Sequence, residues 1–480
     1  MKTKRILSIL TSAVCAANVL SGVNMLASAA TDIEINEANF PDAIFRECVT
    51  EFDTDGNGYF SEEEIAAVTA INVYEMGVSD VTGIEHFTAL EYLNCRFSSL
   101  SNLDVSCNTK LVTLKCEGNS LTSLDLSQNT ALTKLECYSN SLTSLDVSTN
   151  TELTELDCHS NPLNNLDVSK NTELVKLVCY ETLLTKLDVS ANTELEFLDC
   201  GANALETLDV TSNVSLTILR CFGNLLTEID VSENKLLTCI EAGNNKLTQL
   251  DVSNNTALEY LYCYNNCLKN IDISVNTALK YFYCDRNYLK KLDVSTNTEL
   301  EYLHCFGNSL TTLDVSKNPK LWQLLCSRNN LTSLDLSENY ELGDLDIWCF
   351  NNSYRIVLSE DDTFDLSTLP EGFDVSRTSE WTNATVEGNI LKIENPEENV
   401  TYSYDTGYKN APFILVPTDA SSGDVTGDGE VNLYDVIEIS KYILGMREFN
   451  AGESVIADYN MDGNVNLYDA VEIAMIIMNK

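Results

Sequence analysis

Residues 111–129 read LVTLKCEGNSLTSLDLSQN, and this pattern returns every 21 residues between about residue 90 and residue 349. Its aspartate recurs twelve times without a change of spacing. A short fixed period is typical of a solenoid, because one unit cannot bury its apolar face alone and neighbouring units must stack. The aspartates are Asp104, Asp125, Asp146, Asp167, Asp188, Asp209, Asp230, Asp251, Asp272, Asp293, Asp314 and Asp335.

Within one unit, Leu114 and Cys116 alternate with polar residues, which predicts a short strand with both side chains facing inward. Asn119 is expected to turn the chain and to bond neighbouring backbone. The segment LDLS at 124–127 also alternates, so we expect a second extended segment there rather than a helix. The spacing resembles that of a leucine-rich repeat of short bacterial length, with cysteine in the third apolar position. This resemblance implies a curved solenoid with a parallel sheet on its concave side.

Cysteine occupies the position of Cys116 in eleven repeats, and Ala242 takes that position in the one exception. A position that accepts alanine requires a small apolar side chain, so buried free thiols are predicted. Disulfides, the usual state of cysteines in an exported chain, remain the alternative. Free thiols in an exported protein would indicate an anaerobic habitat. The ladder consists of Cys95, Cys116, Cys137, Cys158, Cys179, Cys200, Cys221, Cys263, Cys284, Cys305 and Cys326.

The stacked aspartates would repel one another, because neighbours ~4.8 Å apart cost about 1 kcal/mol per pair even in water. We expect each carboxylate to accept hydrogen bonds from backbone N–H groups or from the adjacent serine column, which begins with Ser106, Ser127 and Ser148. Cations bound along the ladder are the alternative.

Outward positions on the concave strands carry aromatic or imidazole side chains in three consecutive repeats. Such a concentration exceeds what strand formation requires, and the hypothesis is a surface that binds a glycan or a protein. Cross-strand ladders that only stiffen the sheet are the alternative. The candidate ligand-binding residues are Tyr260, Tyr262, Tyr264, Tyr281, Tyr283, Tyr302, His304 and Phe306.

The segment DTDGNGYFSEEE at 53–64 has oxygen-bearing groups at the spacing of a full EF-hand calcium loop. Helices are expected at 41–52 and 61–68. A single hand at this place is expected to hold calcium as a lock on the fold of an N-terminal cap. The candidate ligands are Asp53, Asp55, Asn57, the carbonyl of Tyr59, Ser61 and Glu64.

Two further loops, DVTGDGEVNLYD at 424–435 and DYNMDGNVNLYD at 458–469, lie 34 residues apart. Oxygens at positions 1, 3, 5, 9 and 12, with glycine at position 6, suit a hard cation. Each loop runs directly into a helix with apolar periodicity. A duplicated loop and helix at the C-terminus resembles a type I dockerin over 423–480, the module that attaches proteins to cohesin domains of a cellulosomal scaffoldin.

The resemblance implies calcium ligands in both loops and a cohesin-reading surface on both helices. Because the two copies share the same Leu-Tyr pair, a two-way binding mode is a further expectation. The calcium ligands would be Asp424, Thr426, Asp428, the carbonyl of Glu430, Asn432 and Asp435, then Asp458, Asn460, Asp462, the carbonyl of Asn464, Asn466 and Asp469. The cohesin-binding residues would be Leu433, Tyr434, Ser440, Lys441, Leu467, Tyr468, Ala474 and Met475.

The N-terminus has the features of a secretory signal: a basic start, an apolar stretch at 6–23 and small residues at 27–30. Polar interruptions in the apolar stretch argue against a retained membrane span. The formal net charge of −44 excludes nucleic acid and anionic membranes as partners. We expect a secreted protein, extracellular or held at the cell surface through a cellulosome.

The expected fold class is a mainly β solenoid with an α-helical EF-hand-like cap, a small β-sandwich-like module and an α-helical dockerin. The expected domains are a signal peptide at 1–30, the cap at 31–88, the leucine-rich solenoid at 89–349, a β-rich spacer or cap at 350–417 and the dockerin at 423–480. The role of 350–417 stays open.

The chain has three histidines and none of the common zinc, nucleophile-elbow or phosphate-loop motifs, so it is not expected to be an enzyme. The expected function is that of a non-catalytic cellulosomal component linked to polysaccharide degradation, with Ca²⁺ as its cofactor. A protein-interaction or inhibitor-like regulator is the alternative. The ligand of the solenoid and the particular cohesin stay open.

Overall fold

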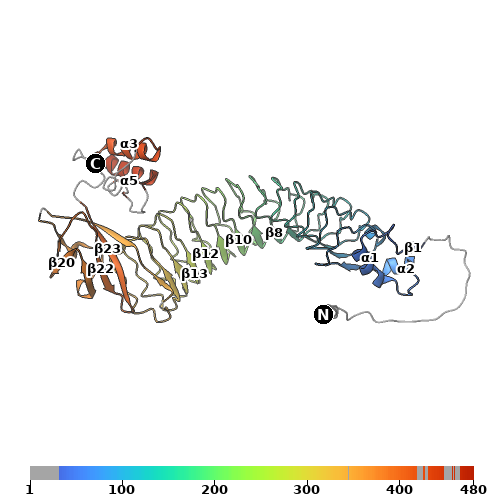
Figure 1. Ribbon diagram of the computed structural model, residues 1–480, viewed down its shortest axis with the longest axis horizontal. Helices are drawn as coiled ribbons and strands as arrows, with labels where there is room; N and C mark the ends of the chain where they lie inside the picture. Colours follow the sequence, from blue (N-terminus) through green and yellow to red (C-terminus); the bar gives the residue numbers. More distant parts are fainter. Residues whose placement is uncertain are drawn as a thin grey trace, which may run out of the picture.

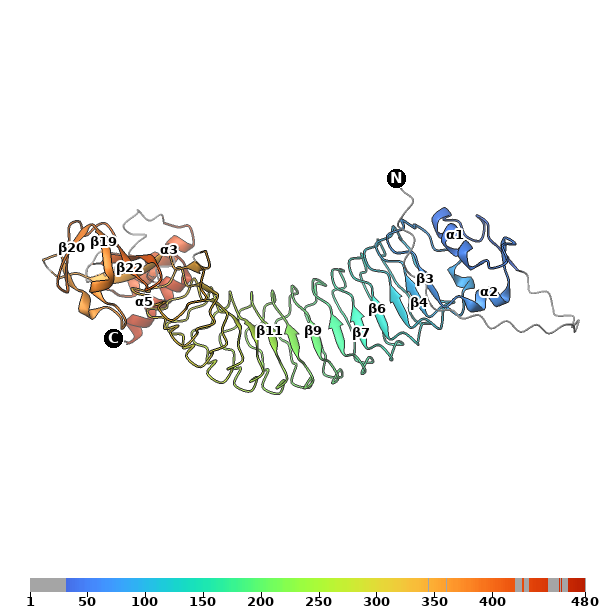
Figure 2. The same ribbon diagram turned by 90° about the horizontal axis from the view of Figure 1, so that it is seen from below.

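A computed structural model of the chain describes residues 32–343, 345–359, 361–418, 425–426, 431–447, 457, 459 and 465–479. The chain forms an arc-shaped solenoid with a small helical cap at its N-terminal end and a β-rich module at its C-terminal end (Figures 1 and 2). Two helices of the C-terminal region lie beside that module. Within the described ranges, no helix combines the length and the apolar character that crossing a membrane requires. The expected signal peptide at 1–30 lies outside the described residues.

One 14-stranded parallel sheet runs along the whole solenoid, from β3 to β16, and each strand pairs with the next one in sequence. The strands lie on the concave side of the arc (Figure 1). The sheet begins inside 31–88, so the proposed cap contributes its first strand. The strands are β3 (Ala70–Asn72), β4 (Tyr92–Asn94), β5 (Thr113–Lys115), β6 (Lys134–Glu136), β7 (Glu155–Asp157), β8 (Lys176–Val178), β9 (Phe197–Asp199), β10 (Ile218–Arg220), β11 (Cys239–Glu241), β12 (Tyr260–Tyr262), β13 (Tyr281–Tyr283), β14 (Tyr302–His304), β15 (Gln323–Leu325) and β16 (Ile347–Trp348).

The core of the solenoid is built from the apolar positions of the repeat. Leu114 and Cys116 are fully buried, as are their counterparts in neighbouring turns. The segment 124–127 on the opposite side forms neither helix nor strand, so the absence of a helix there is as expected, although no second sheet forms. The result is a single-sheet solenoid closed by irregular extended segments.

Two columns of buried asparagines tie successive turns together. Asn161 Nδ2 donates to the carbonyls of Cys137 and Cys158 at 3.0 and 3.1 Å, and its Oδ1 accepts from the N–H of Leu142 at 3.0 Å. In the second column, Asn171 Nδ2 donates to the carbonyls of Val147 and Asn150. The prediction that Asn119 and its counterparts, which form the first column, bond neighbouring backbone is therefore confirmed.

The N-terminal cap places a cluster of phenylalanines on the first turns. Helix α1 (Ala43–Val49) begins at Asp42, whose side chain accepts from two N–H groups of the first turn, and continues as a 3₁₀ turn, η1 (Thr50–Phe52). Helix α2 (Glu62–Ala67) begins at Ser61 with a capping box. Both helices lie within the predicted ranges. The remaining elements are β1 (Ile33–Glu34), β2 (Tyr59–Phe60) and η2 (Ile84–His86).

The C-terminal module consists of two sheets, with strand orders β17-β23-β22-β19 and β18-β21-β20, which matches the expected sandwich-like module. Tyr402 donates its hydroxyl proton to the carbonyl of Thr332 at 2.5 Å, and Arg377 lies 3.2 Å from Asp335, so the module closes the last repeats. Its elements are β17 (Asn352–Val357), β18 (Thr363–Asp365), η3 (Leu366–Thr368), η4 (Val375–Arg377), β19 (Thr378–Thr382), β20 (Ala384–Glu387), β21 (Ile390–Ile393), β22 (Val400–Asp405) and β23 (Asn410–Thr418).

The C-terminal helices α3 (Leu433–Ile443) and α5 (Leu467–Asn479) pack on each other. They enclose a small core of their own, separate from that of the solenoid. That core contains Val425, Ile439, Ala457, Ala470 and Ile473.

Candidate functional site

The last carboxylate of each C-terminal loop is buried and held by backbone groups of its own loop. Asp435 accepts from the N–H groups of Thr426 at 2.9 Å and Asn432 at 2.7 Å. Asp469 accepts from the N–H of Asn466 at 2.8 Å. Both aspartates have no exposed surface. Buried carboxylates in an oxygen-rich loop fit a bound cation, which would supply the charge compensation that burial demands.

Seven of the predicted calcium ligands lie outside the described residues. They are Asp424, Asp428, Glu430, Asp458, Asn460, Asp462 and Asn464. The complete ligand sets of the two loops therefore stay predictions.

The predicted cohesin-reading residues divide into exposed and half-buried ones. Leu433 and Tyr434 at the start of α3, and Leu467 and Tyr468 at the start of α5, are exposed apolar side chains. Lys441 is exposed and pairs with Glu438 at 2.6 Å. The remaining three, Ser440, Ala474 and Met475, are half-buried. An exposed Leu-Tyr pair at two helix starts suits a protein interface.

The N-terminal loop brings three carboxylates together. Oxygens of Asp53, Asp55 and Glu64 all lie within 4.8 Å of one another. Gly58, at position 6 of the loop, has φ +84° and makes the sharp turn that the loop needs. This all-oxygen donor set fits Ca²⁺, although its occupancy stays a prediction.

Hydrogen bonds orient the carboxylate at position 12 of the N-terminal loop. Glu64 accepts from the N–H and hydroxyl groups of Ser61 and of Thr54. These bonds, those from Ser61 first, lower the pKa of Glu64 to about 2, so it is ionised at neutral pH. Asn57 accepts from the N–H of Tyr59, and the Ser61 hydroxyl is engaged with Glu64.

The structure brings the eight predicted ligand-binding residues onto one part of the concave face. The rings of Tyr260, Tyr281 and Tyr302 stack in register with centroids 5.0 and 4.4 Å apart. Tyr283 and His304 stack at 3.8 Å. The cross-strand ladders considered as an alternative are therefore present, and these stacked rings cover much of one another's faces, so that edges and hydroxyl groups are what they chiefly offer to a ligand.

The same surface extends further than the sequence pattern predicted. Trp348 pairs in register with Leu325 and so continues the column of Tyr262, Tyr283 and His304. Trp348, Phe350 and Trp322 are about half exposed, at 51%, 45% and 46%. Trp348 and Phe350 were missed because Ile347 follows Leu324 by 23 residues rather than 21, which breaks the register of the repeat. Trp322 was missed because it directly precedes β15, in a column that holds Glu301 in the preceding repeat. We call the eight predicted residues together with Trp322, Trp348 and Phe350 the concave aromatic surface.

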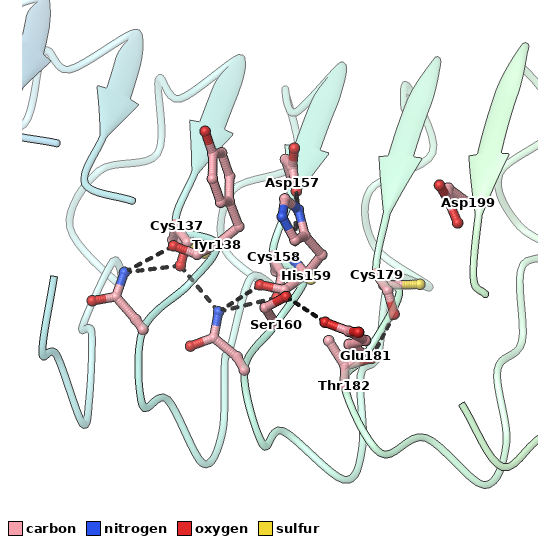
Figure 3. Close-up of polar contacts among 12 residues, drawn as sticks. Cys137, Tyr138, Asp157, Cys158, His159, Ser160, Cys179, Glu181, Thr182 and Asp199 are labelled. Atoms are coloured by element: carbon pink, nitrogen blue, oxygen red, sulfur yellow. Dashed lines mark hydrogen bonds and ion pairs between the residues drawn. The ribbon is translucent and has the colours of Figure 1, made fainter. Parts of the chain in front are cut away.

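A second aromatic stack lies nearer the N-terminal end of the same face. His159 is sandwiched between Tyr138 and Tyr180, with centroids 4.2 Å away on each side. Its Nδ1 lies 2.5 Å from an oxygen of Asp157 (Figure 3). Ser160 donates its hydroxyl proton to Glu181. The three rings lie in the same column as Tyr264, so reading that column at 21-residue steps would have found this second stack.

Glycine permits one ring of the concave aromatic surface to lie directly on the backbone. A Cβ added to Gly243 would stand 2.6 Å from the ring of Tyr264. Any larger residue at this position would therefore push the ring away. The orientation of Tyr264 is set by the preceding repeat and not by a ligand.

A buried carboxylate lies inside the concave aromatic surface. Asp285 occupies the column of Tyr264 and Phe306, and its exposed fraction is only 7%. Burial raises the pKa of Asp285 to about 6. Because the pKa of Asp285 is higher in the folded state than in the unfolded state, its protonated form stabilises the fold. This contribution to the free energy of unfolding is complete below about pH 4 and disappears as the pH rises through about 6.

Asp285→Asn is therefore expected to raise the melting temperature at about pH 7.5 and to leave it nearly unchanged at about pH 4. The amide keeps the size of the side chain and removes the charge that burial disfavours. Thermal unfolding of the parent and the variant at the two pH values measures this. Equal shifts at both pH values would contradict the assignment of the effect to ionisation.

Each carboxylate of the aspartate ladder accepts a hydrogen bond from within its own repeat. In all twelve repeats the aspartate accepts a hydrogen bond from the N–H two residues later, as Asp125 does from Ser127 at 2.9 Å. These bonds lower the pKa of Asp125, with the backbone bond as the largest cause. The predicted compensation by backbone and serine groups is confirmed.

The cysteine ladder consists of buried free thiols, as predicted. All eleven members are fully buried and form no disulfide. Ala242, in the one repeat without this cysteine, is also fully buried. Burial raises the pKa of Cys95 to about 12, so the thiol stays protonated at neutral pH. These cysteines therefore pack as small apolar side chains.

Known proteins resemble this chain in two parts, the C-terminal region and the solenoid. Residues 422–478 match the family model described as the dockerin type I domain. The solved functional domain of InlJ from Listeria monocytogenes, which includes a cysteine ladder, is 29% identical, with a TM-score of 0.61 over 82% of this chain and 99% of that one. The internalin inlF of the same species has a TM-score of 0.60 at 24% identity, over 66% of this chain and 98% of that one, and shares the fold.

A curated relative matches over a shorter stretch. Internalin J of Listeria monocytogenes serotype 4b is 41% identical over 71 residues, which are 15% of this chain. The match spans only 8% of the length of that relative. Residues 422–478 thus contain a type I dockerin domain, and the solenoid is similar in fold to the leucine-rich solenoids of internalins.

Proposed function

We propose that this protein is a non-catalytic, secreted binding component, which its dockerin attaches to a cohesin and whose solenoid binds a ligand through the concave aromatic surface. The observation that carries the proposal is the type I dockerin at 422–478 on an internalin-like solenoid. Repeat solenoids and dockerins are both non-catalytic kinds of domain. Attachment through a cohesin would place the protein outside the cell or at its surface, in a cellulosome.

Calcium is the proposed cofactor of the dockerin and of the N-terminal loop at 53–64. Support comes from the buried Asp435 and Asp469 and from the carboxylate cluster that contains Asp53, Asp55 and Glu64. The dockerin is expected to need the ion most, because the core that its described residues form is small.

A protein is the better-supported ligand of the solenoid. The stacked tyrosines offer ring edges and hydroxyl groups, which suit hydrogen bonding to a protein surface better than stacking against a flat sugar ring. A leucine-rich surface that recognises a protein also fits an inhibitor-like regulator unrelated to glycans.

Polysaccharide is the second candidate, and the half-exposed indoles of Trp322 and Trp348 favour it. These rings lie at the C-terminal end of the concave aromatic surface, where Trp322 meets Tyr302 at a tilt of 59° rather than in a parallel stack. A glycan bound there would link the protein to polysaccharide degradation.

Replacing Tyr262, Tyr283 and His304 together by alanine is expected to abolish ligand binding without unfolding the solenoid. These side chains are half-buried on the sheet surface and are not part of the leucine and cysteine core. Pull-down of parent and variant against insoluble cellulose, xylan and pectin, and against proteins from the surrounding cell surfaces, measures the effect.

Replacing Tyr138 and Tyr180 by alanine is the matched control, since these rings stack on the same face outside the concave aromatic surface. Ligand capture that survives the first set of substitutions and disappears with the second would place the ligand elsewhere on the face. Capture by one of the polysaccharides would decide in favour of the second candidate.

A further inference from the structure

The two copies of the dockerin carry an identical Leu-Tyr pair, while two other cohesin-binding positions differ, with Ser440 and Lys441 in the first copy and Ala474 and Met475 in the second. Leu433 and Tyr434 correspond to Leu467 and Tyr468 after a shift of 34 residues, and the surrounding VNLYD is the same in both. By this shared pair alone, either copy could face a cohesin equally well. In the folded chain, however, the two copies have different surroundings.

Tyr468 of the second copy packs against the solenoid. Its ring lies 4.7 Å from the ring of Tyr288, tilted by 43°. Tyr468 is consequently 45% exposed, whereas Tyr434 of the first copy is 69% exposed. The paired leucines, Leu433 and Leu467, are both 62% exposed, so the difference is confined to the tyrosines.

A second contact joins the same two parts of the chain. The guanidinium of Arg355, on β17, lies 5.1 Å from the ring centre of Tyr459, which precedes α5. Figures 1 and 2 both place α3 and α5 beside the C-terminal end of the solenoid and the β-rich module. Two separate aromatic contacts thus join the second copy of the dockerin to the solenoid and to the β-rich module.

Tyr288 is an exception in its column. The same position holds Cys267 in the preceding repeat and Ser309 in the following one, and no other repeat has an aromatic residue there. Tyr288 is half-buried and does not belong to the solenoid core. Its bulk is therefore not required by the repeat, and its contact with Tyr468 accounts for a large ring at this place.

We infer that Tyr288 makes the two cohesin-reading faces unequal: the solenoid engages Tyr468 of the second copy, and cohesin binds the full chain mainly through Leu433 and Tyr434 of the first. The inference rests on the proposed binding of a cohesin by the dockerin. Binding through the second copy would first require separation of Tyr468 from Tyr288, which lowers the apparent affinity by roughly 2- to 12-fold. The partner of Tyr468 in the free chain is therefore this chain's own solenoid.

Cohesin affinities of full-length variants test the inference. With a type I cohesin that binds the parent in the presence of calcium, Leu433→Ala/Tyr434→Ala should weaken binding roughly 2- to 12-fold more than Leu467→Ala/Tyr468→Ala. Adding Tyr288→Ala to both double variants should reduce the difference between their affinities. Tyr340→Ala is the matched control, because Tyr340 is a solenoid tyrosine that is 75% exposed. Equal affinities in the presence of Tyr288 would overturn the inference.

A crosslink tests the contact without any cohesin. In a Cys267→Ser background, Tyr288→Cys with Tyr468→Cys should be joined by a short bismaleimide crosslinker, which spans the space left by the two rings, and the crosslink is identified by mass spectrometry of the digested chain. Tyr288→Cys with Tyr434→Cys should not. Failure of the first pair, or equal crosslinking of both, would overturn the inference. A chain that crosslinks as expected but binds no cohesin would instead contradict the proposed function.

Discussion

Asn161→Ala is expected to lower the free energy of unfolding of the solenoid by about 3 to 5 kcal/mol. The substitution removes the side chain that bonds the carbonyls of Cys137 and Cys158 and the N–H of Leu142. The carbonyl of Cys137 keeps its bond from Asn140. The carbonyl of Cys158 and the N–H of Leu142 lose theirs, and each buried group left without a partner costs about 1 to 3 kcal/mol. Urea denaturation followed by circular dichroism measures the loss.

The chain contains its own control for this prediction. Thr182 replaces asparagine in the same column and donates its hydroxyl proton to the carbonyl of Cys179 at 2.6 Å. Asn161→Thr can make the corresponding bond to Cys158, so it should lose only about half as much stability as Asn161→Ala. A loss below about 1 kcal/mol for the alanine variant would mean that the asparagine column does not hold the turns together.

Removal of calcium is expected to unfold the dockerin and leave the solenoid intact. Within the described residues the dockerin core has five buried members, and without the ion the buried charges of Asp435 and Asp469 would lose the positive charge that offsets their burial. Hydrogen exchange in α3 and α5 should accelerate by roughly 100-fold in EDTA, whereas exchange in β5 to β15 should not change.

The N-terminal loop should respond less strongly to the same treatment. The cap around it shares its core with the first turns of the solenoid through Phe40, Phe45 and Phe87, so apolar packing holds it without the ion. Faster exchange is expected only within 53–64. Asp53→Ala should reproduce this local change, and Asp435→Ala with Asp469→Ala should reproduce the unfolding of the dockerin. Loss of protection throughout the solenoid in EDTA would show that cations also hold the array.

The repeat made most of this fold predictable, for a physical reason. A 21-residue period places Leu114, Cys116 and Asn119 at equivalent positions in every turn, so one solution for burial and backbone bonding serves the whole array. The aspartate ladder followed from the same logic, because a repeated charge requires repeated compensation.

Features that break the period, or that depend on contacts between distant segments, could not be predicted in this way. Trp348 joins the concave aromatic surface only because a longer repeat still pairs its strand in register. Stacking of Tyr283 on His304 depends on ring rotation, which spacing does not determine. The contact between Tyr288 and Tyr468 joins residues from two domains, and the shared Leu-Tyr pair alone indicates two equivalent dockerin faces.

The dockerin is proposed to attach a binding solenoid to a cohesin in a calcium-dependent way. Isothermal titration of the full-length protein with a panel of type I cohesins measures this attachment. We predict that at least one cohesin binds with a single site in calcium, that binding is lost in EDTA, and that Asp435→Ala with Asp469→Ala also abolishes it. Failure of every cohesin to bind in calcium, or binding that persists in EDTA, would contradict the account.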